Sequence, residues 1–248
     1  MAYLGIDIGG SAIKGALVDL KKGELSTPRI RIETPEDNNP KNIANIIHTI
    51  VANFKYEGPV GCGFPAVVKN GIVLSAANIH PDWIDINAAK MFRKKTGNQF
   101  YIANDADVAG LAEMKFGAGK KVQEGVVLII TLGTGIGTAI FSDGYLLPNT
   151  EFGHIKIRGK DAEKRASGAA KKNGKLSWAK WTDRLQEFLN EMEVLFSPDL
   201  IIVGGGVSKS SDKFLPLVKL NAKIVPAELL NEAGIIGAAL YASQMSHK

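Results

Sequence analysis

Apolar residues along the chain form short runs bounded by glycine, proline or polar residues, which is typical of strands in a covered sheet. Such runs predict strands at residues 3–8, 13–19, 29–33, 60–64, 67–68, 72–74, 99–103, 126–132, 138–141, 200–203 and 222–225. Asn70-Gly71, between two of these runs, is a strong signal for a hairpin turn. Strand signals therefore occur in both halves of the chain.

Other stretches place apolar residues at the i, i+3, i+4, i+7 spacing of an amphipathic helix. The clearest one begins at Pro40 and aligns on one face Ile43, Ile46, Ile47, Ile50, Val51 and Phe54. Further helices are expected at 86–95, with Asp85 as N-cap and Gly97 at the end, and at 106–116, 161–172, 177–196 and 234–242. Both halves thus combine strands with helices, an α/β pattern with no obvious linker.

The composition is that of a globular protein with an ample core. Of the 248 residues, 45% are hydrophobic, enough for one large or two modest α/β domains. The single cysteine, Cys62, excludes an internal disulfide and a multi-cysteine zinc site. No apolar stretch reaches the roughly 20 residues that cross a bilayer, and the chain begins on a strand rather than a signal peptide. We therefore expect a cytoplasmic protein without a membrane partner.

Positive charge is concentrated in one segment of the chain. Residues 156–184 hold ten Lys or Arg and three Asp or Glu, whereas the whole chain carries a net charge of +5. The rest of the chain is therefore slightly acidic. This distribution indicates either an anionic partner or a solvated helix face, and charge alone does not separate the two.

Three apolar strands are each followed by a glycine-rich turn, and these turns are candidate phosphate-binding loops. They are Gly9-Gly10-Ser11, Gly133-Thr134-Gly135 with Thr131 just before it, and Gly204-Gly205-Gly206. Glycine lets the backbone approach a phosphate closely, and rows of backbone N–H groups form anion-binding concavities. No Gly-Lys-Ser/Thr sequence opens a helix, so none of them is a Walker A loop.

Two charged residues flank the first turn. Asp7 cannot bind phosphate directly, but it can hold Mg²⁺ or a metal-bound water that faces phosphate. Lys14 supplies positive charge from the following strand. The alternative is a tight hairpin with Asp7 facing solvent.

Asn104-Asp105 lies where a predicted strand ends and a helix begins. A carboxylate there points into the crevice at the carboxyl edge of a sheet, and the helix N-terminus favours its ionised form. It can accept the proton of a hydroxyl that attacks phosphorus. The alternative is an ordinary Asn-Asp helix cap. Farther along, Glu151 and His154 flank Phe152-Gly153 and make a candidate polyol-binding pair, with a structural histidine as the alternative.

Together these residues resemble a known group of proteins. Residues 5–19, 131–141, 203–208 and 233–239 resemble the phosphate, adenosine and connecting motifs of the sugar kinase/Hsp70/actin superfamily. Asn104-Asp105 with Glu151-Phe152-Gly153-His154 narrows the resemblance to the ROK family (repressors, open reading frames and kinases). It covers essentially the whole chain.

The resemblance implies an α/β protein with a two-domain actin-like (ribonuclease H-like) fold and a central cleft. The small domain would comprise residues 1–104 and the C-terminal helix 234–248, and the large domain residues 105–233. The two would close over a sugar, and the protein would be a homodimer. By analogy Asp105 is the catalytic base, and the sugar contacts are Asn78, Asn104, Glu151 and His154.

One departure from the usual family pattern concerns the segment after His154. ROK sugar kinases usually have a cysteine-rich zinc loop there, but residues 155–167 contain no cysteine, so we expect no zinc at His154. This form, with Trp178 and Trp181 downstream, resembles the polyphosphate glucokinases. Glu163 is expected to replace the sugar-binding glutamate of the zinc-containing relatives. We expect the two tryptophans to pack in the core or a dimer rather than stack on a base.

The resulting expectation is a cytoplasmic kinase that transfers a phosphoryl group from polyphosphate, with ATP as an alternative donor, to the 6-hydroxyl of glucose. Mg²⁺ is the expected cofactor, and no nucleic acid is an expected partner. The basic segment would supply a track for polyphosphate. Its expected members are Lys156, Arg158, Lys160, Lys164, Arg165, Lys171 and Lys172.

Three rival functions stay open. The first is an ATP-dependent kinase of mannose, fructose or an N-acetyl hexosamine. The second is a sugar-sensing repressor, although only two residues precede Tyr3 and leave no room for a DNA-binding segment. The third is an actin-like filament subunit, in which the Glu151–His154 pair has no role.

Overall fold

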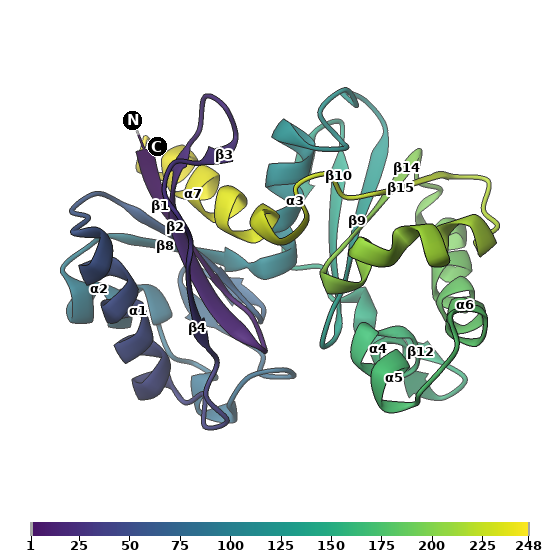
Figure 1. Cartoon of the computed structure of the whole chain (residues 1–248), viewed down its shortest axis with the longest axis horizontal. Coiled ribbons are helices and arrows are strands. Elements are labelled where there is room, and N and C mark those ends of the chain that lie inside the picture. The colour runs from purple at the N-terminus through teal and green to yellow at the C-terminus, as the bar shows by residue number, and fades with distance from the viewer. Residues whose placement is uncertain (1, 248) are drawn as a thin grey trace. The chain divides into compact units, whose positions relative to one another are not determined.

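The computed structural model describes residues 2–247 of the chain. These residues form two compact units, one running to Ala112 and resuming at Glu232, and the other spanning Glu113–Asn231 (Figure 1). The helix α3 (Asp105–Phe116) carries the boundary between the units. None of the helices in the described residues is long and apolar enough to cross a membrane.

The first unit is built on a six-stranded sheet. Its main order is β3 (Glu24–Leu25), β2 (Ala12–Asp19), β1 (Ala2–Ile8), β5 (Val60–Phe64) and β8 (Phe100–Asn104), with β4 (Ile30–Glu33) also paired to β2. β1 and β2 are antiparallel, whereas β1, β5 and β8 run parallel. The parallel strands therefore end at one edge, where β8 leads into α3.

Helices cover both faces of this sheet. Successive residues of a strand point to opposite faces. Leu4 and Ile6 share a core with α1 (Pro40–Phe54) and α2 (Ala88–Thr96), whereas Gly5 between them lies against Ile235 of α7 (Ala233–Ser246). Smaller elements are β6 (Val68–Lys69), β7 (Ile72–Val73) and η1 (Pro81–Trp83).

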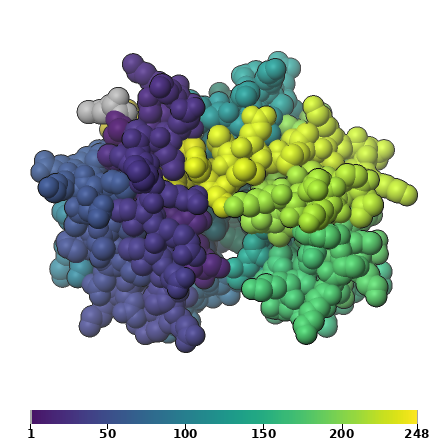
Figure 2. Space-filling model, viewed as in Figure 1, coloured from purple at the N-terminus to yellow at the C-terminus, as the bar shows by residue number. Residues whose placement is uncertain are grey.

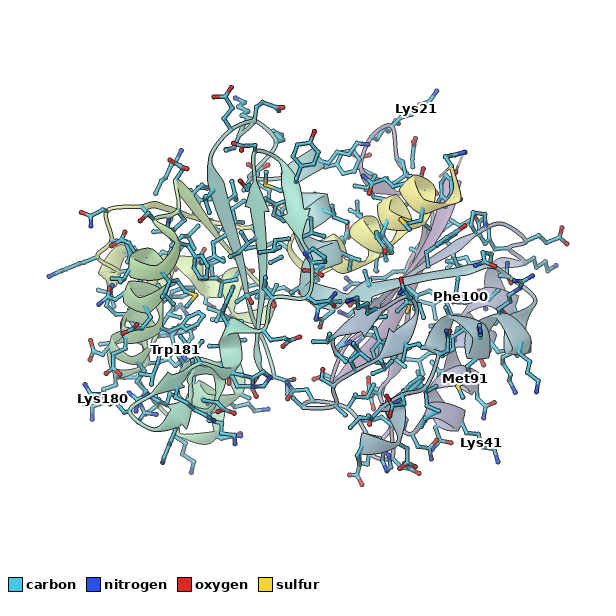
Figure 3. The ribbon with its side chains drawn as sticks, turned by 180° about the vertical axis from the view of Figure 1, so that it is seen from behind. Lys21, Lys41, Met91, Phe100, Lys180 and Trp181 are labelled. Carbon is cyan, nitrogen blue, oxygen red and sulfur yellow. The ribbon has the colours of Figure 1, made fainter. Side chains whose placement is uncertain are left out.

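The second unit has a five-stranded sheet. Its order is β11 (Tyr145–Leu147), β10 (Ile136–Ser142), β9 (Val126–Leu132), β14 (Leu200–Gly204) and β15 (Lys223–Pro226). The helix α6 (Trp178–Phe196) packs on it through Trp181, Leu185 and Phe188. Figure 3 shows Trp181 inside this unit and Phe100 inside the first, with Lys21, Lys41 and Lys180 pointing outward.

The connections of the second unit carry several short elements. They are η2 (Phe152–His154), β12 (Lys156–Ile157), β13 (Lys160–Asp161), α4 (Ala162–Ala166), α5 (Gly168–Asn173), η3 (Gly206–Lys213), η4 (Leu215–Leu217) and η5 (Leu230–Glu232). Ser177 caps α6 through a hydrogen bond from the N–H of Lys180 to its Oγ.

Two details of the predicted helices are wrong. The cap of α2 is Asn87, whose Oδ1 accepts from the N–H of Lys90 at 2.9 Å, and Asp85 instead adopts a left-handed backbone with φ of 64°. The single helix expected at 161–172 is divided at Ser167, whose backbone is extended and whose Oγ caps α5. The indole of Trp181 donates to the carbonyls of Ala166 and Ser167, and so satisfies the carbonyl groups at the break.

Candidate phosphate and sugar sites

Asn104 and Asp105 mark the passage from β8 to α3 in the first unit. The Asn104 side chain is buried, and its Oδ1 accepts from the N–H groups of Ala106 at 2.9 Å and Asp107 at 3.3 Å. Its Nδ2 donates to the carbonyl of Ala66 at 3.2 Å. Asn104 therefore caps α3, as in the alternative interpretation. The cap fixes Asp105 at the first position of α3, where the helix dipole favours a carboxylate.

The first glycine turn joins β1 to β2 and is held by the end of β4. Thr34 donates its hydroxyl to the carbonyl of Gly9 at 2.6 Å, and its N–H to the carbonyl of Ser11 at 3.3 Å. Gly10 and Ser11 are exposed at the tip. Sequence reasoning missed Thr34, which follows a strand but belongs to none of the glycine motifs.

Asp7 and Lys14 face each other across β1 and β2, with Oδ2 and Nζ 3.2 Å apart. Both side chains are largely buried, so the alternative in which Asp7 faces solvent is wrong. Asp7 also lies beside the first turn of α7, because a Cβ at Gly234 would come within 2.8 Å of its carboxyl carbon. The fold therefore places Asp7 between the Lys14 ammonium and the N-terminal turn of α7.

The second and third glycine turns meet within the second unit. β9 and β14 are parallel neighbours, with Thr131 opposite Gly204, so both turns leave the sheet at the same edge. Gly205 has a φ of 79°, and a Cβ on it would lie 2.6 Å from the backbone of Leu132. Only glycine satisfies both requirements here.

The start of α5 also contacts these turns. The N–H of Ala169 donates to the carbonyl of Gly133 at 3.0 Å. A Cβ at Gly168 would lie 2.6 Å from the side chain of Val207 and 3.0 Å from the carbonyl of Gly133. The break at Ser167 thus brings α5 against two turns that lie far apart in sequence, and the three segments together form a backbone-lined corner.

His154 is surrounded by carboxylates of the second unit. Its Nε2 lies 3.7 Å from Glu151, and its Nδ1 lies 3.6 Å from Asp161 and 3.9 Å from Glu163. Glu163 is buried, and one of its oxygens accepts from the N–H of Ile136 at 3.4 Å. The structure therefore brings together Glu151, His154 and Glu163, three of the residues proposed to contact the sugar.

Asp161 is a member of this group that sequence reasoning missed. The hairpin of β12 and β13 places Lys156 directly opposite it, and the two side chains form an ion pair. The hydrogen bond from Lys156, with the charges of Lys156 and Lys164, holds the pKa of Asp161 below its usual value. The turn of this hairpin is Arg158-Gly159, both with positive φ, and Gly159 is the one sequence signal for it.

The remaining expected sugar residue and the tryptophans lie as follows. Asn78 is exposed in the loop between β7 and η1 of the first unit. Trp181 is fully buried, and Trp178 is half-buried and stacks on Phe214 with ring centroids 5.9 Å apart. The expectation that both tryptophans are packing residues is thus met within this unit.

In residues 2–247, no three His, Cys, Asp or Glu side chains are grouped in a way that holds a metal ion.

The basic residues of segment 156–172 divide into two sets. Lys156 and Lys164 pair with Asp161, and Arg158 and Arg165 pair with Glu187 of α6 at 3.0 and 2.7 Å. Across the part of the chain that the structure describes, no acidic side chain pairs with Lys160, Lys171 or Lys172. Four of the seven expected track residues are therefore held in ion pairs, two with each carboxylate.

The partly buried carboxylate of Glu151 predicts a measurable stability effect. Burial raises the pKa of Glu151, His154 lowers it in part, and the charge of Glu163 raises it further. A raised folded-state pKa means that the folded protein loses stability as pH rises through that pKa. Glu151→Gln is therefore expected to raise Tm at pH 7, and the gain should vanish below about pH 4, where the unfolded carboxyl is protonated too.

Glu187 provides the matched control for this prediction. Burial acts to raise its pKa, but the hydrogen bonds and charges of Arg158 and Arg165 outweigh burial and lower it. Glu187→Gln should therefore lower Tm at pH 7. Thermal unfolding of both variants at several pH values tests the pair, and equal Tm shifts would contradict the assignment.

Comparison with known proteins places the chain in a family. The ROK family model matches residues 3–171. A polyphosphate glucokinase of Mycobacterium tuberculosis is 45% identical over 237 residues, which is 95% of this chain and 89% of the relative.

Solved structures agree with this result. An inorganic polyphosphate/ATP-glucomannokinase from Arthrobacter sp. strain KM matches with a TM-score of 0.96 and 45% identity, over 98% of this chain and 99% of that one. A ROK family glucokinase from Streptomyces griseus, solved with glucose and AMPPNP, matches with a TM-score of 0.86 and 25% identity, over 98% and 100%. These matches confirm the expected α/β sugar-kinase fold. The chain belongs to the ROK family.

Proposed function

We propose that this protein is a polyphosphate glucokinase, which transfers the terminal phosphoryl group of inorganic polyphosphate to the 6-hydroxyl of glucose and yields glucose 6-phosphate. ATP is the second donor in this proposal. The observation that carries it is the 45% identity, along 95% of the chain, to a protein described as a polyphosphate glucokinase. The fold likeness to a polyphosphate/ATP-glucomannokinase supports the choice of both donors, and it makes mannose the first alternative sugar to test.

In this proposal Asp105 is the catalytic base. Its carboxylate accepts the proton of the 6-hydroxyl as the oxygen attacks phosphorus. Its place at the start of α3, fixed by the Asn104 cap, supports an ionised and well-oriented base. The sugar contacts proposed with it are Asn78, Asn104, Glu151, His154 and Glu163.

The second unit supplies the proposed sugar-recognition group. Glu151, His154 and Glu163 offer both acceptors and a donor, which suits the alternating hydroxyls of a hexose. Asp161 lies 3.6 Å from Nδ1 of His154 and in this proposal helps to orient the ring. A hexose bound there would replace solvent around Glu151, whose carboxylate is already partly desolvated.

The glycine turns would hold the transferring and neighbouring phosphates. The roles are divided among the turn Gly9–Ser11, the turn Thr131–Gly135, and Gly204–Gly206 for the nucleotide or the next phosphates. Lys14 supplies a cation that Asp7 already orients at 3.2 Å. Such preorganised donors stabilise charge without reorganising during the reaction.

Mg²⁺ fits this donor set as a metal held mainly by the substrate. Mg²⁺ typically uses one or two carboxylates together with phosphate oxygens, and Asp7 is the carboxylate available beside the first turn. When bound, the ion offsets charge on the phosphate oxygens as the bond to the leaving group breaks. Assembly as a homodimer is a further part of the proposal, taken from the family.

The test is to measure glucose 6-phosphate formed by the purified protein with Mg²⁺, using polyphosphate or ATP, at low and high salt. We expect turnover with both donors, and only the polyphosphate reaction should weaken strongly as salt rises, because a polyanion releases counterions when it binds cations. Turnover with ATP alone would remove polyphosphate from the proposal. The absence of product with glucose, mannose, fructose and N-acetyl hexosamines would remove the kinase assignment.

A further inference from the structure

The second unit carries a group of lysines whose charge no acid offsets. They lie on α5, on the turn after it and on η3, and we call them the lysine rim: Lys171, Lys172, Lys175, Lys209 and Lys213. Within the described residues none of the five forms an ion pair, in contrast to the lysines and arginines of segment 156–165 that pair with Asp161 and Glu187. Residues 168–180 contain four lysines and no acid.

The two segments of the rim lie side by side although about 40 residues separate them in sequence. Gly168 at the start of α5 contacts Val207 at the start of η3. Farther on, the ammonium groups of Lys171 and Lys213 lie 4.0 and 6.0 Å from the centroid of the same ring, that of Trp178. Figure 2 shows the yellow-green atoms of η3 bordering the green atoms of the α5 region.

Trp178 is the platform that keeps these two lysines together. Its ring stacks on Phe214, tilted by only 11°, so its position is fixed by packing. The attraction between a cation and the ring face offsets part of the repulsion between the two ammonium groups. Unpaired like charges held close together favour an anion between or over them.

The rim begins at the glycine turns. η3 starts at Gly206, the last residue of the third turn, and α5 starts against the carbonyl of Gly133 in the second turn. An anionic chain held at the turns by one phosphate would therefore continue onto the rim. A nucleoside triphosphate has only three phosphates. A longer polyphosphate has further phosphate groups, whose negative charges would lie over the lysine rim.

We propose that the lysine rim binds the part of the polyphosphate chain beyond the phosphate groups held at the glycine turns. This inference rests on the proposed function. It assigns Lys175, Lys209 and Lys213 to donor binding alongside Lys171 and Lys172. It removes from that role the four cations that form ion pairs with Asp161 and Glu187.

A second group of unpaired cations lies on α2 in the first unit, at Lys90, Arg93, Lys94 and Lys95. Three of them occupy its last turn, where positive charge is stabilised by the carbonyl end of the helix. No glycine turn of the second unit adjoins this group in sequence. It therefore serves as the charge-matched control surface.

The experiment compares two triple variants with the full-length protein. Lys172, Lys209 and Lys213 are replaced with glutamine in the first. Lys171 is kept because its ammonium lies nearer the Trp178 ring, at 4.0 Å from the centroid against 6.0 Å for Lys213. Lys90, Lys94 and Lys95 are replaced with glutamine in the second. The Kd for fluorescently labelled polyphosphate is measured by anisotropy over a range of salt concentrations, together with KM for polyphosphate and for ATP.

The rim variant is expected to bind polyphosphate roughly tenfold or more weakly, and the slope of log Kd against log salt should fall by about two to three units. Its KM for ATP should change far less, and the α2 variant should bind polyphosphate like the unaltered protein. Equal loss in both variants, or unchanged binding by the rim variant, would overturn the inference while leaving polyphosphate as donor. If the unaltered protein neither binds nor uses polyphosphate but turns over ATP, the polyphosphate donor and the rim assignment fail together.

Discussion

Replacing Asp105 with asparagine is expected to lower kcat by roughly 10² to 10⁴, the usual contribution of a positioned general base, while glucose affinity changes little. Asparagine keeps an oxygen that can accept from the N–H of Ala106, the bond that Asp105 makes at 2.8 Å, so the start of α3 should persist. What is lost is the negative charge that accepts the proton of the attacking hydroxyl. Steady-state kinetics with both donors and calorimetric glucose binding measure the two effects separately.

The control for this variant is Asp85→Asn in the same unit. Asp85 is exposed and has a left-handed backbone, which asparagine adopts readily, so kcat and Tm should both stay unchanged. A near-normal kcat for Asp105→Asn would remove Asp105 as the base. A large drop in the Tm of Asp105→Asn would instead assign its loss of activity to unfolding.

Gly61→Ala is expected to destabilise the first unit by about 3 kcal/mol or more, at the upper end of the range for overpacked cores. Gly61 is the second residue of β5, and a Cβ there would overlap the carbonyl oxygen of Ala238 in α7. Gly5 in β1 has the same relation to Ile235. Backbone meets backbone at both points, so no side-chain rotation can make room, and α7 would have to lift from the sheet.

A matched glycine separates this steric effect from a backbone effect. Gly144 has a φ of 78°, and no atom lies within 4 Å of the Cβ that alanine would add. Gly144→Ala should therefore cost only about 1 to 2 kcal/mol, the strain of a left-handed residue. Urea unfolding of both variants measures the difference, and a cost at Gly61 no larger than at Gly144 would contradict the close seating of α7.

Local sequence signals predicted most helices and strands, because each signal depends only on residues that are close together in the sequence. Period-two and period-3.6 patterns, the proline at the start of α1 and Gly97 after α2 depend only on neighbouring residues. The three glycine turns and the Asn104-Asp105 junction were predictable for the same reason. These signals also carried the resemblance to the ROK family, which the comparisons confirm.

Other features depend on residues that lie far apart in sequence. The helix break at Ser167 is stabilised by Trp181, which donates to the carbonyls at the break, although Ser167-Gly168 was a local turn signal that the helical pattern of residues 161–172 outweighed. The ion pairs of Arg158 and Arg165 need Glu187 of α6, which is more than 20 residues away from both arginines. A charge count of the segment could not distinguish these cations from the lysine rim.

The sequence by itself determined the strand and helix pattern, the glycine turns, the acid at the head of α3 and the family. Tertiary structure alone decided that Asp161 faces His154, that α5 meets two distant turns, and that α7 lies directly on the glycines of β1 and β5. The reason is physical. Propensities and caps are fixed by adjacent residues, whereas ion pairing and close backbone contact depend on which distant segments pack together.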